Sequence, residues 1–138
     1  MARERWATEE AFLKGNVGAL DEVFDADCVF HTPPLLPSYK LEQLKQFALG
    51  MLQSMSDVQW SWDDVVIEGN TAAQRFTIRG KHTGTVPFIP VPPTGKEVVI
   101  GGCAVYHLKN GKVIEFFEYS DFLGFFQQLG IVPPMKMK

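Results

Sequence analysis

Asp121 carries a carboxyl group that could act in proton transfer. It directly precedes Phe122 to Leu129, which has the pattern of a short helix, so its carboxylate could cap that helix. Helix amides favour the ionised carboxylate, whereas aromatic surroundings that include Phe117 and Tyr119 would favour the protonated acid. A carboxyl group in such aromatic surroundings can act as a general acid or base on a carbon acid. On the residues alone, both roles stay open.

The three histidines have similar alternatives. His107 could donate a proton to a carbonyl oxygen or stabilise an enolate, or it could be a solvated residue at the end of a strand. His82 lies where a strand leaves for a proline-rich segment, and could bind a ligand at a rim or only the loop backbone. His31, with Tyr39 shortly after it, could lie at the mouth of a pocket or be structural. The spacing of the histidines and carboxylates predicts no metal site.

Tryptophans are the third group of candidate binding residues. Trp60 and Trp62 share one parity of a predicted strand, so they should share one environment. Together with Trp6 they could form a flat apolar wall for a planar polycyclic substrate, although most tryptophans in small domains are ordinary core residues.

These side chains must be positioned by helices near the amino terminus and strands after them. Ala2 to Lys14 suits a helix with Trp6, Phe12 and Leu13 on its apolar side, and a second short helix is expected over Val17 to Phe24. Cys28 to His31 predicts a short strand. A third helix begins near Leu41, because its apolar residues recur on one face: Leu41, Leu44, Ala48, Met51, Leu52 and Met55.

From Val58 the apolar residues alternate, which predicts a strand. The alternation changes parity at Asp63-Asp64, which indicates a β-bulge or a break, and Gly69-Asn70 then turns the chain into a second strand. His82 to Gly95 carries four prolines and cannot be a central strand. Glu97 to Lys109 and Lys112 to Ser120 predict a hairpin about Asn110-Gly111.

Both parities of this hairpin are apolar, so we expect one face to meet the helices and the other a partner. Helices followed by a long antiparallel sheet indicate an α+β fold in which a curved sheet wraps around the helices and leaves a hollow. The whole chain, residues 1–138, is expected to form one domain, because 46 % hydrophobic residues suffice for one core.

Composition also limits the partners and the location of the protein. A net charge of −3, with 13 scattered basic residues, offers no surface for nucleic acid or for an anionic membrane. No segment has the length and apolarity of a signal peptide or membrane span. Cys28 and Cys103 are too few and too far apart for a disulfide scaffold or a metal knuckle, so we expect reduced thiols in a cytoplasmic protein.

Several stretches resemble, in order and spacing, the SnoaL-like polyketide cyclase family of the nuclear-transport-factor-2-like superfamily. They are Gly80-Lys81-His82-Thr83-Gly84, Pro92-Pro93-Thr94-Gly95-Lys96, Asn110-Gly111-Lys112-Val113-Ile114-Glu115, Asp121 and Gln127-Gln128-Leu129-Gly130. The resemblance covers essentially the whole chain.

The resemblance implies a cone-shaped barrel with a deep apolar pocket and a homodimer packed through the sheet. It also implies an intramolecular aldol ring closure of a polyketide-like carbonyl compound, without cofactor or metal, in which Asp121 is the acid/base. We therefore expect Asp121 and His107 as catalytic residues. The expected substrate-binding residues are His31, Tyr39, Trp60, Trp62, His82, Phe117 and Tyr119.

Two other functions stay open on the same fold. The protein could bind a small apolar molecule without catalysis, with Asp121 only capping its helix. It could also be an epoxide hydrolase, which would need two carboxylates beside an arginine. Asp121, Asp64 and Arg79 could be combined in this way, but their expected parities do not favour it.

Overall fold

The computed structural model describes residues 2–33, 36–85 and 91–133. It contains three α-helices, one 3-10 helix and six strands within these ranges. The helices are α1 (Ala2–Lys14), η1 (Val17–Glu22), α2 (Leu41–Ser54) and α3 (Phe122–Gln128). The strands are β1 (Phe24–Thr32), β2 (Leu36–Tyr39), β3 (Met55–Glu68), β4 (Thr71–His82), β5 (Glu97–Lys109) and β6 (Lys112–Ser120).

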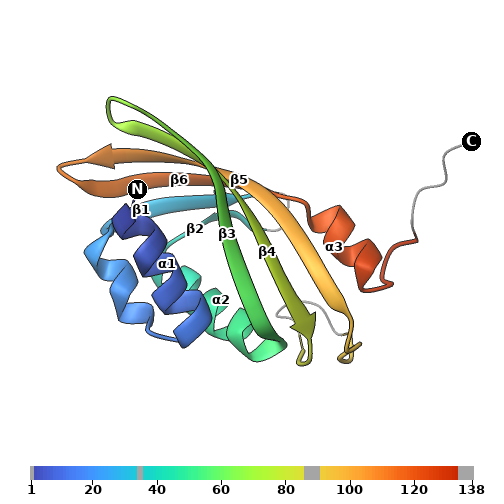
Figure 1. Ribbon diagram of the computed structural model, residues 1–138. Helices are drawn as coiled ribbons and strands as arrows, with labels where there is room; N and C mark the ends of the chain where they lie inside the picture. The colour runs from blue at the N-terminus through green and yellow to red at the C-terminus, as the bar shows by residue number, and fades with distance from the viewer. Residues whose placement is uncertain (1, 34–35, 86–90, 134–138) are drawn as a thin grey trace, which may run out of the picture.

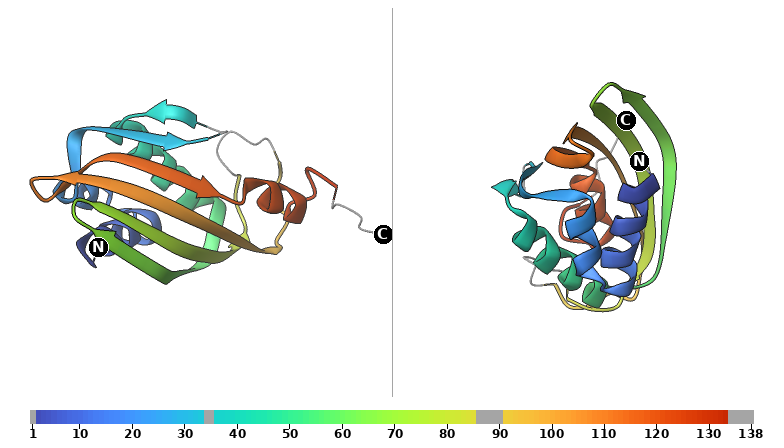
Figure 2. Two further views of the ribbon diagram at one scale, coloured as in Figure 1. Left: turned by 90° about the horizontal axis from the view of Figure 1, so that it is seen from above. Right: turned by 90° about the vertical axis from the view of Figure 1, so that its left-hand side faces the viewer.

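One curved sheet with the order β2-β1-β6-β5-β4-β3 forms most of the fold. All neighbouring strands are antiparallel except β1 and β6, which are parallel. The sheet bends strongly around α1, η1 and α2, so that the helices lie inside its curve, as the end-on view in Figure 2 shows. The α+β fold expected from the sequence, with a curved sheet wrapped around the first helices, is confirmed.

The core lies between the helices and the concave face of the sheet. Small residues of α1, Ala7 and Ala11, are completely buried there, whereas Trp6, expected on the apolar side of this helix, is 42 % exposed. The face of α2 predicted from its spacing is confirmed, because Leu41, Leu44 and Ala48 are buried. The two helices therefore close the hollow of the sheet from one side.

The long strands follow the predicted pattern closely. The register of β3 against β4 shifts between Trp62 and Asp64, where the change of parity predicts a bulge. The β5–β6 turn has positive φ at Asn110 and Gly111, the backbone that this dipeptide favours in tight hairpins. Inward residues of β5 such as Val98 and Tyr106 are buried, whereas Cys103 on the opposite parity is exposed.

Some elements differ from expectation. The second helix is a 3-10 helix, and β2 was not predicted because Pro37 and the two prolines before the strand suggest only an irregular connection. Of the proline-rich segment after His82, residues 86–90 lie outside the described residues. At the other end of the chain, α3 packs on β5, where the side-chain amide of Gln128 bonds both backbone groups of Val99. No helix among the described residues is long and apolar enough to span a membrane.

Candidate active site

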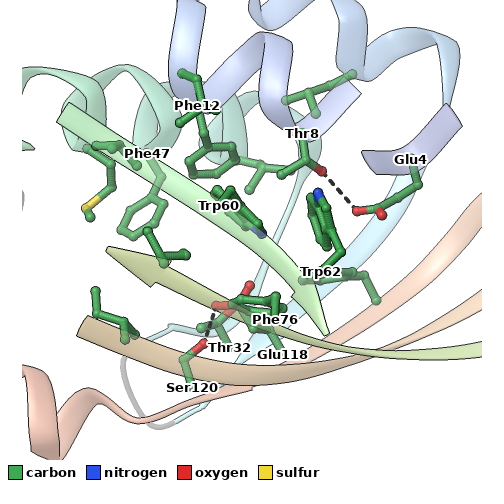
Figure 3. A pocket seen from close by; sticks show the side chains of 18 of the residues that line it. Glu4, Thr8, Phe12, Thr32, Phe47, Trp60, Trp62, Phe76, Glu118 and Ser120 are labelled. Carbon is green, nitrogen blue, oxygen red and sulfur yellow. Dashed lines mark hydrogen bonds between the residues drawn. The ribbon is translucent and has the colours of Figure 1, made fainter. Parts of the chain in front are cut away.

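A cavity of about 240 Å³ lies between the helices and the concave face of the sheet. Figure 3 shows side chains from α1 and α2 on one side of it and side chains from the sheet on the other. Aromatic rings form much of its wall: Phe12, Phe24, Phe47, Trp60, Trp62, Phe76, Tyr106, Phe116 and Phe122. None of the described residues that line it is a lysine, arginine or histidine.

Trp60 and Trp62 stand next to each other in this wall. Alternate residues of β3 face the same side, so both rings turn inward, and they stack with centroids 5.2 Å apart. Phe12 meets Trp60 edge-on at 5.6 Å, and Phe76 lies 5.6 Å from the same ring. The indole N–H of Trp62 donates to Glu9 Oε1 at 3.0 Å. These contacts fix a rigid aromatic surface.

Glu118 places a carboxyl group in this apolar wall. It lies on β6 between Phe116 and Ser120 of the same parity, and these three side chains line the cavity. Ser120 Oγ donates to Glu118 Oε2 at 3.0 Å, as Figure 3 shows. Protein atoms surround the carboxyl, and the surface that remains accessible faces the cavity. Burial raises the pKa of Glu118 to about 7, and the nearby charge of Glu4 acts in the same direction.

A second carboxyl, Glu4, lines the helix side of the cavity and is 4 % exposed. Its Oε1 accepts from the hydroxyls of Thr8 at 2.9 Å and Tyr106 at 3.0 Å. Its Oε2 accepts from Gln74 Nε2 at 2.9 Å, and Arg5 Nε donates to Gln74 Oε1 at 2.7 Å, which fixes the orientation of the amide. Burial raises the pKa of Glu4, although its hydrogen bonds oppose this effect.

Tyr39 supplies a third polar group. Its hydroxyl lies 2.6 Å from Thr32 Oγ1, and both residues line the cavity. Burial raises the pKa of Tyr39, so its hydroxyl stays protonated near neutral pH. One hydroxyl proton of this pair is not used between the two oxygens and is free to bond a ligand oxygen.

The structure brings three of the expected binding residues together in the cavity, namely Tyr39, Trp60 and Trp62. Phe117 and His31 lie on the outer face of the sheet, where their rings stack at 4.5 Å and His31 Nε2 lies 3.1 Å from Glu115 Oε2. Tyr119 also points outward and is 59 % exposed.

The other expected site residues are not among those that line the cavity. Asp121 is exposed, and its Oδ1 accepts from the backbone N–H of Gly124 at 2.8 Å, so it caps α3 as one interpretation predicts. His107 lies 3.5 Å from Thr71 Oγ1 and 6.0 Å from the ring of Phe117. His82 is completely buried, and its Nδ1 accepts from the backbone N–H of Thr94, as the loop-binding interpretation expects.

Sequence reasoning missed Glu118 and Glu4. Aromatic residues occupy both parities of β6, so the sequence does not show whether Phe116 and Glu118 or Phe117 and Tyr119 face inward. The pairing of Phe116 with buried Tyr106 decides the question in the structure. The helical spacing of α1 could have indicated Glu4. It lies one turn before Ala7 and Thr8 and therefore on the same buried side of the helix.

No group of three or more His, Cys, Asp or Glu in the described part of the chain is arranged to hold a metal ion.

Comparison with known proteins gives the same fold and names a family. A sequence profile of the SnoaL-like polyketide cyclases matches residues 3–129. The chain belongs to the SnoaL-like polyketide cyclase family. No curated protein matches it in sequence.

Solved structures support the fold of this SnoaL-like protein. IdmH of Streptomyces antibioticus, provisionally a polyketide cyclase, has a TM-score of 0.75 and 25 % identity over 90 % of this chain and 94 % of its own. TsrD of Streptomyces laurentii has a TM-score of 0.78 and 22 % identity over 95 % and 97 % of the two chains. AclR of Streptomyces galilaeus, provisionally a hydroxylase, has a TM-score of 0.81 and 20 % identity over 98 % and 85 %. Since provisional cyclases and a provisional hydroxylase share the fold, the chemistry must be argued from the cavity.

Proposed function

We propose that this protein is a cofactor-independent enzyme of the cyclase or isomerase type, which acts on a small apolar carbonyl compound with Glu118 as its acid/base. One observation carries the proposal: a carboxyl whose pKa burial raises to about 7 lines a cavity that is otherwise mostly apolar. An acid/base group works best when its pKa lies near the working pH. Membership of the SnoaL-like cyclase family supports the reaction type.

The proposed reaction begins when the ionised Glu118 takes a proton from the carbon next to a carbonyl group. The electron pair of that C–H bond forms an enolate, whose carbon attacks a second carbonyl carbon of the same molecule. The alkoxide that results takes the proton back from Glu118, which restores the starting carboxylate. The apolar wall excludes water from the enolate, and the enclosed shape brings the two ends of a flexible substrate together.

The Thr32–Tyr39 pair is the candidate donor to the substrate oxygens. Ser120 donates its one hydroxyl proton to Glu118 and so holds that carboxyl in place. The free hydroxyl proton of the Thr32–Tyr39 pair could stabilise the enolate oxygen. In this proposal Trp60 and Trp62 provide the flat surface against which a planar substrate packs.

Asp121 is the acid/base expected from the family resemblance, and its role can be separated from that of Glu118 by two matched variants. Glu118→Gln keeps the shape of the pocket group and removes its transferable proton. Asp121→Asn keeps an acceptor for the N–H of Gly124 and removes its charge. We would measure turnover and binding of a panel of aromatic polyketide esters and aromatic ketones with both variants.

The proposal predicts that Glu118→Gln loses about a hundredfold or more in turnover while binding is retained, since acid/base catalysis is worth about 10²–10⁴-fold. Asp121→Asn should turn over at nearly the wild-type rate. If Asp121→Asn loses turnover and Glu118→Gln keeps it, Asp121 and not Glu118 is the acid/base. Binding without turnover by the wild type across the panel would favour a non-catalytic binding protein.

A hydrolase that brackets an arginine between two carboxylates finds no support in the cavity. Arg79 is exposed, and Asp64 pairs at 2.7 Å with Arg75, which is also exposed. Because no arginine is among the described residues that line the cavity, we do not propose epoxide hydrolysis.

A further inference from the structure

Two carboxyl groups line the cavity, and no basic residue is among its described lining residues. Glu118 and Glu4 both line it, and the described lining residues include no lysine, arginine or histidine. Neither carboxyl takes part in an ion pair among the described residues. Buried carboxylates in folded proteins are usually paired with a cation.

Glu118 is the carboxyl that could bind a ligand most directly. Ser120 donates to Oε2, and in the described part of the chain Oε1 receives no hydrogen bond. The side chain of Glu118 lines the cavity, as Figure 3 shows. A donor carried by a ligand would therefore complete the hydrogen bonding of Glu118.

The rest of the wall also suits a cation. Rings of Phe12, Trp60, Trp62 and Phe76 surround the space beside the carboxyls in Figure 3. The faces of aromatic rings attract ammonium and guanidinium groups, and indole attracts them most. Trp62 already has one such contact, since the guanidinium carbon of Arg5 lies 5.9 Å from its ring centroid.

We propose that the cavity selects its ligand by charge and binds an organic ammonium, an arylalkyl amine in its protonated form, with Glu118 as the counter-ion. The ammonium N–H donates to Glu118 Oε1, the aromatic part packs on the Trp60–Trp62 surface, and the charge of Glu4 adds a favourable field. An anion of the same shape meets two carboxyls and no cation. This inference uses the same cavity as the proposed function but needs no turnover.

The groups that face Glu118 determine how binding changes with pH. They are Glu4 on α1, Tyr39 on β2 and Tyr106 on β5. Burial raises the pKa of both tyrosines, so neither becomes charged near neutral pH. The tyrosines therefore do not change the cavity charge near pH 7, whereas Glu118 ionises in this range and burial also raises the pKa of Glu4. An ammonium should bind more tightly as these carboxyls ionise.

Three probes of nearly equal shape test the proposal by calorimetry. They are 2-(aminomethyl)naphthalene as the cation, 2-(hydroxymethyl)naphthalene as the neutral compound and 2-naphthoate as the anion. Above pH 7 we expect the amine to bind about tenfold or more tightly than the alcohol, and the naphthoate about tenfold or more weakly, each factor equivalent to about 1.4 kcal/mol. The affinity for the amine should rise as the pH increases through about 7.

Two variants test whether Glu118 causes the preference for the amine. Glu118→Gln should remove the pH-dependent rise and most of the preference for the amine, whereas Glu10→Gln, a change on α1 outside the cavity lining, should leave both unchanged. If Glu118→Gln does not fold, the pH dependence of the wild type decides the question.

An alcohol that binds as tightly as the amine above pH 7, or an amine that does not bind, would overturn the inference. An amine preference that survives unchanged in Glu118→Gln would also overturn it. These outcomes are independent of the turnover of carbonyl compounds, so charge selection and the proposed catalysis can fail separately.

Discussion

Glu118 and Glu4 differ in the number of hydrogen bonds that their carboxyl groups accept from the described residues. Glu4 accepts three hydrogen bonds from fixed donors, an arrangement that holds one geometry. Among the described residues, Glu118 accepts one hydrogen bond, from Ser120, which leaves Oε1 available to a ligand in our proposal. Burial raises the pKa of both groups, and we propose that the one with fewer hydrogen bonds exchanges a proton with a substrate.

Glu118 should make the stability of the protein depend on pH. Its folded-state pKa of about 7 lies above the ordinary value of 4.5, so the folded state holds the proton more tightly than the unfolded chain does. The stabilisation is complete below pH 4.5, declines as pH rises, and is lost above about 7. A raised pKa of this size corresponds to about 3 kcal/mol.

We therefore expect Glu118→Gln to gain stability relative to the wild type by up to about 3 kcal/mol between about pH 4.5 and pH 8. Urea unfolding of both proteins across this range measures the difference. A constant difference between the two proteins over the whole range would show that Glu118 has an ordinary pKa.

Adjacent glycines of β5 illustrate how an element shapes the cavity. A Cβ atom at Gly102 would lie 2.6 Å from Phe76 Cζ and 2.6 Å from Ser120 Oγ, so the strand must carry glycine where these two lining residues approach it. A Cβ atom at Gly101 would meet nothing within 4 Å, because that residue faces the other side of the sheet.

Gly102→Ala should displace Phe76 and Ser120, destabilise the fold by about 1–3 kcal/mol and weaken ligand binding. Gly101→Ala is the matched control and should change stability by about 0.5 kcal/mol or less. Thermal unfolding and probe titration of both variants test this. Equal behaviour of the two would mean that the cavity wall tolerates a methyl group at Gly102.

Most elements could be predicted from the sequence because their signals are local. The apolar face of α2, the parity change at Asp63-Asp64 and the Asn110-Gly111 turn each require a few neighbouring residues only. The positions of Glu118 and Glu4 could not be predicted, because they depend on residues far apart in the sequence. The inward face of β6 depends on its pairing with β5, and the fit of Glu4 among Gln74 and Tyr106 depends on contacts between distant segments.

At the scale of the whole molecule, the outer face of the sheet keeps apolar and aromatic side chains at its surface. Tyr119 is 59 % exposed and Val99 is 37 % exposed. The apolar character of both parities led us to expect a partner on this face, and we propose that the partner is a second copy of the chain.

Tyr119→Lys should then shift the protein from dimer to monomer, because two lysines would be placed in or near a self-complementary interface. Trp6→Lys, on the helix side and 42 % exposed, is the control and should leave the assembly unchanged. Light scattering after size exclusion reports the mass directly. A wild-type monomer at all concentrations would contradict the proposed dimer.

The protein as a whole can be described as a curved sheet and two helices that hold two carboxyls, Glu118 and Glu4, in an apolar cavity. The most direct test of this description is a titration of Glu118 by carbon NMR, with glutamate labelled at the carboxyl carbon and the signal assigned from its loss in Glu118→Gln. We predict a midpoint near 7. A midpoint near 4.5, the ordinary value, would show that water reaches this carboxyl freely and would contradict the proposed acid/base role.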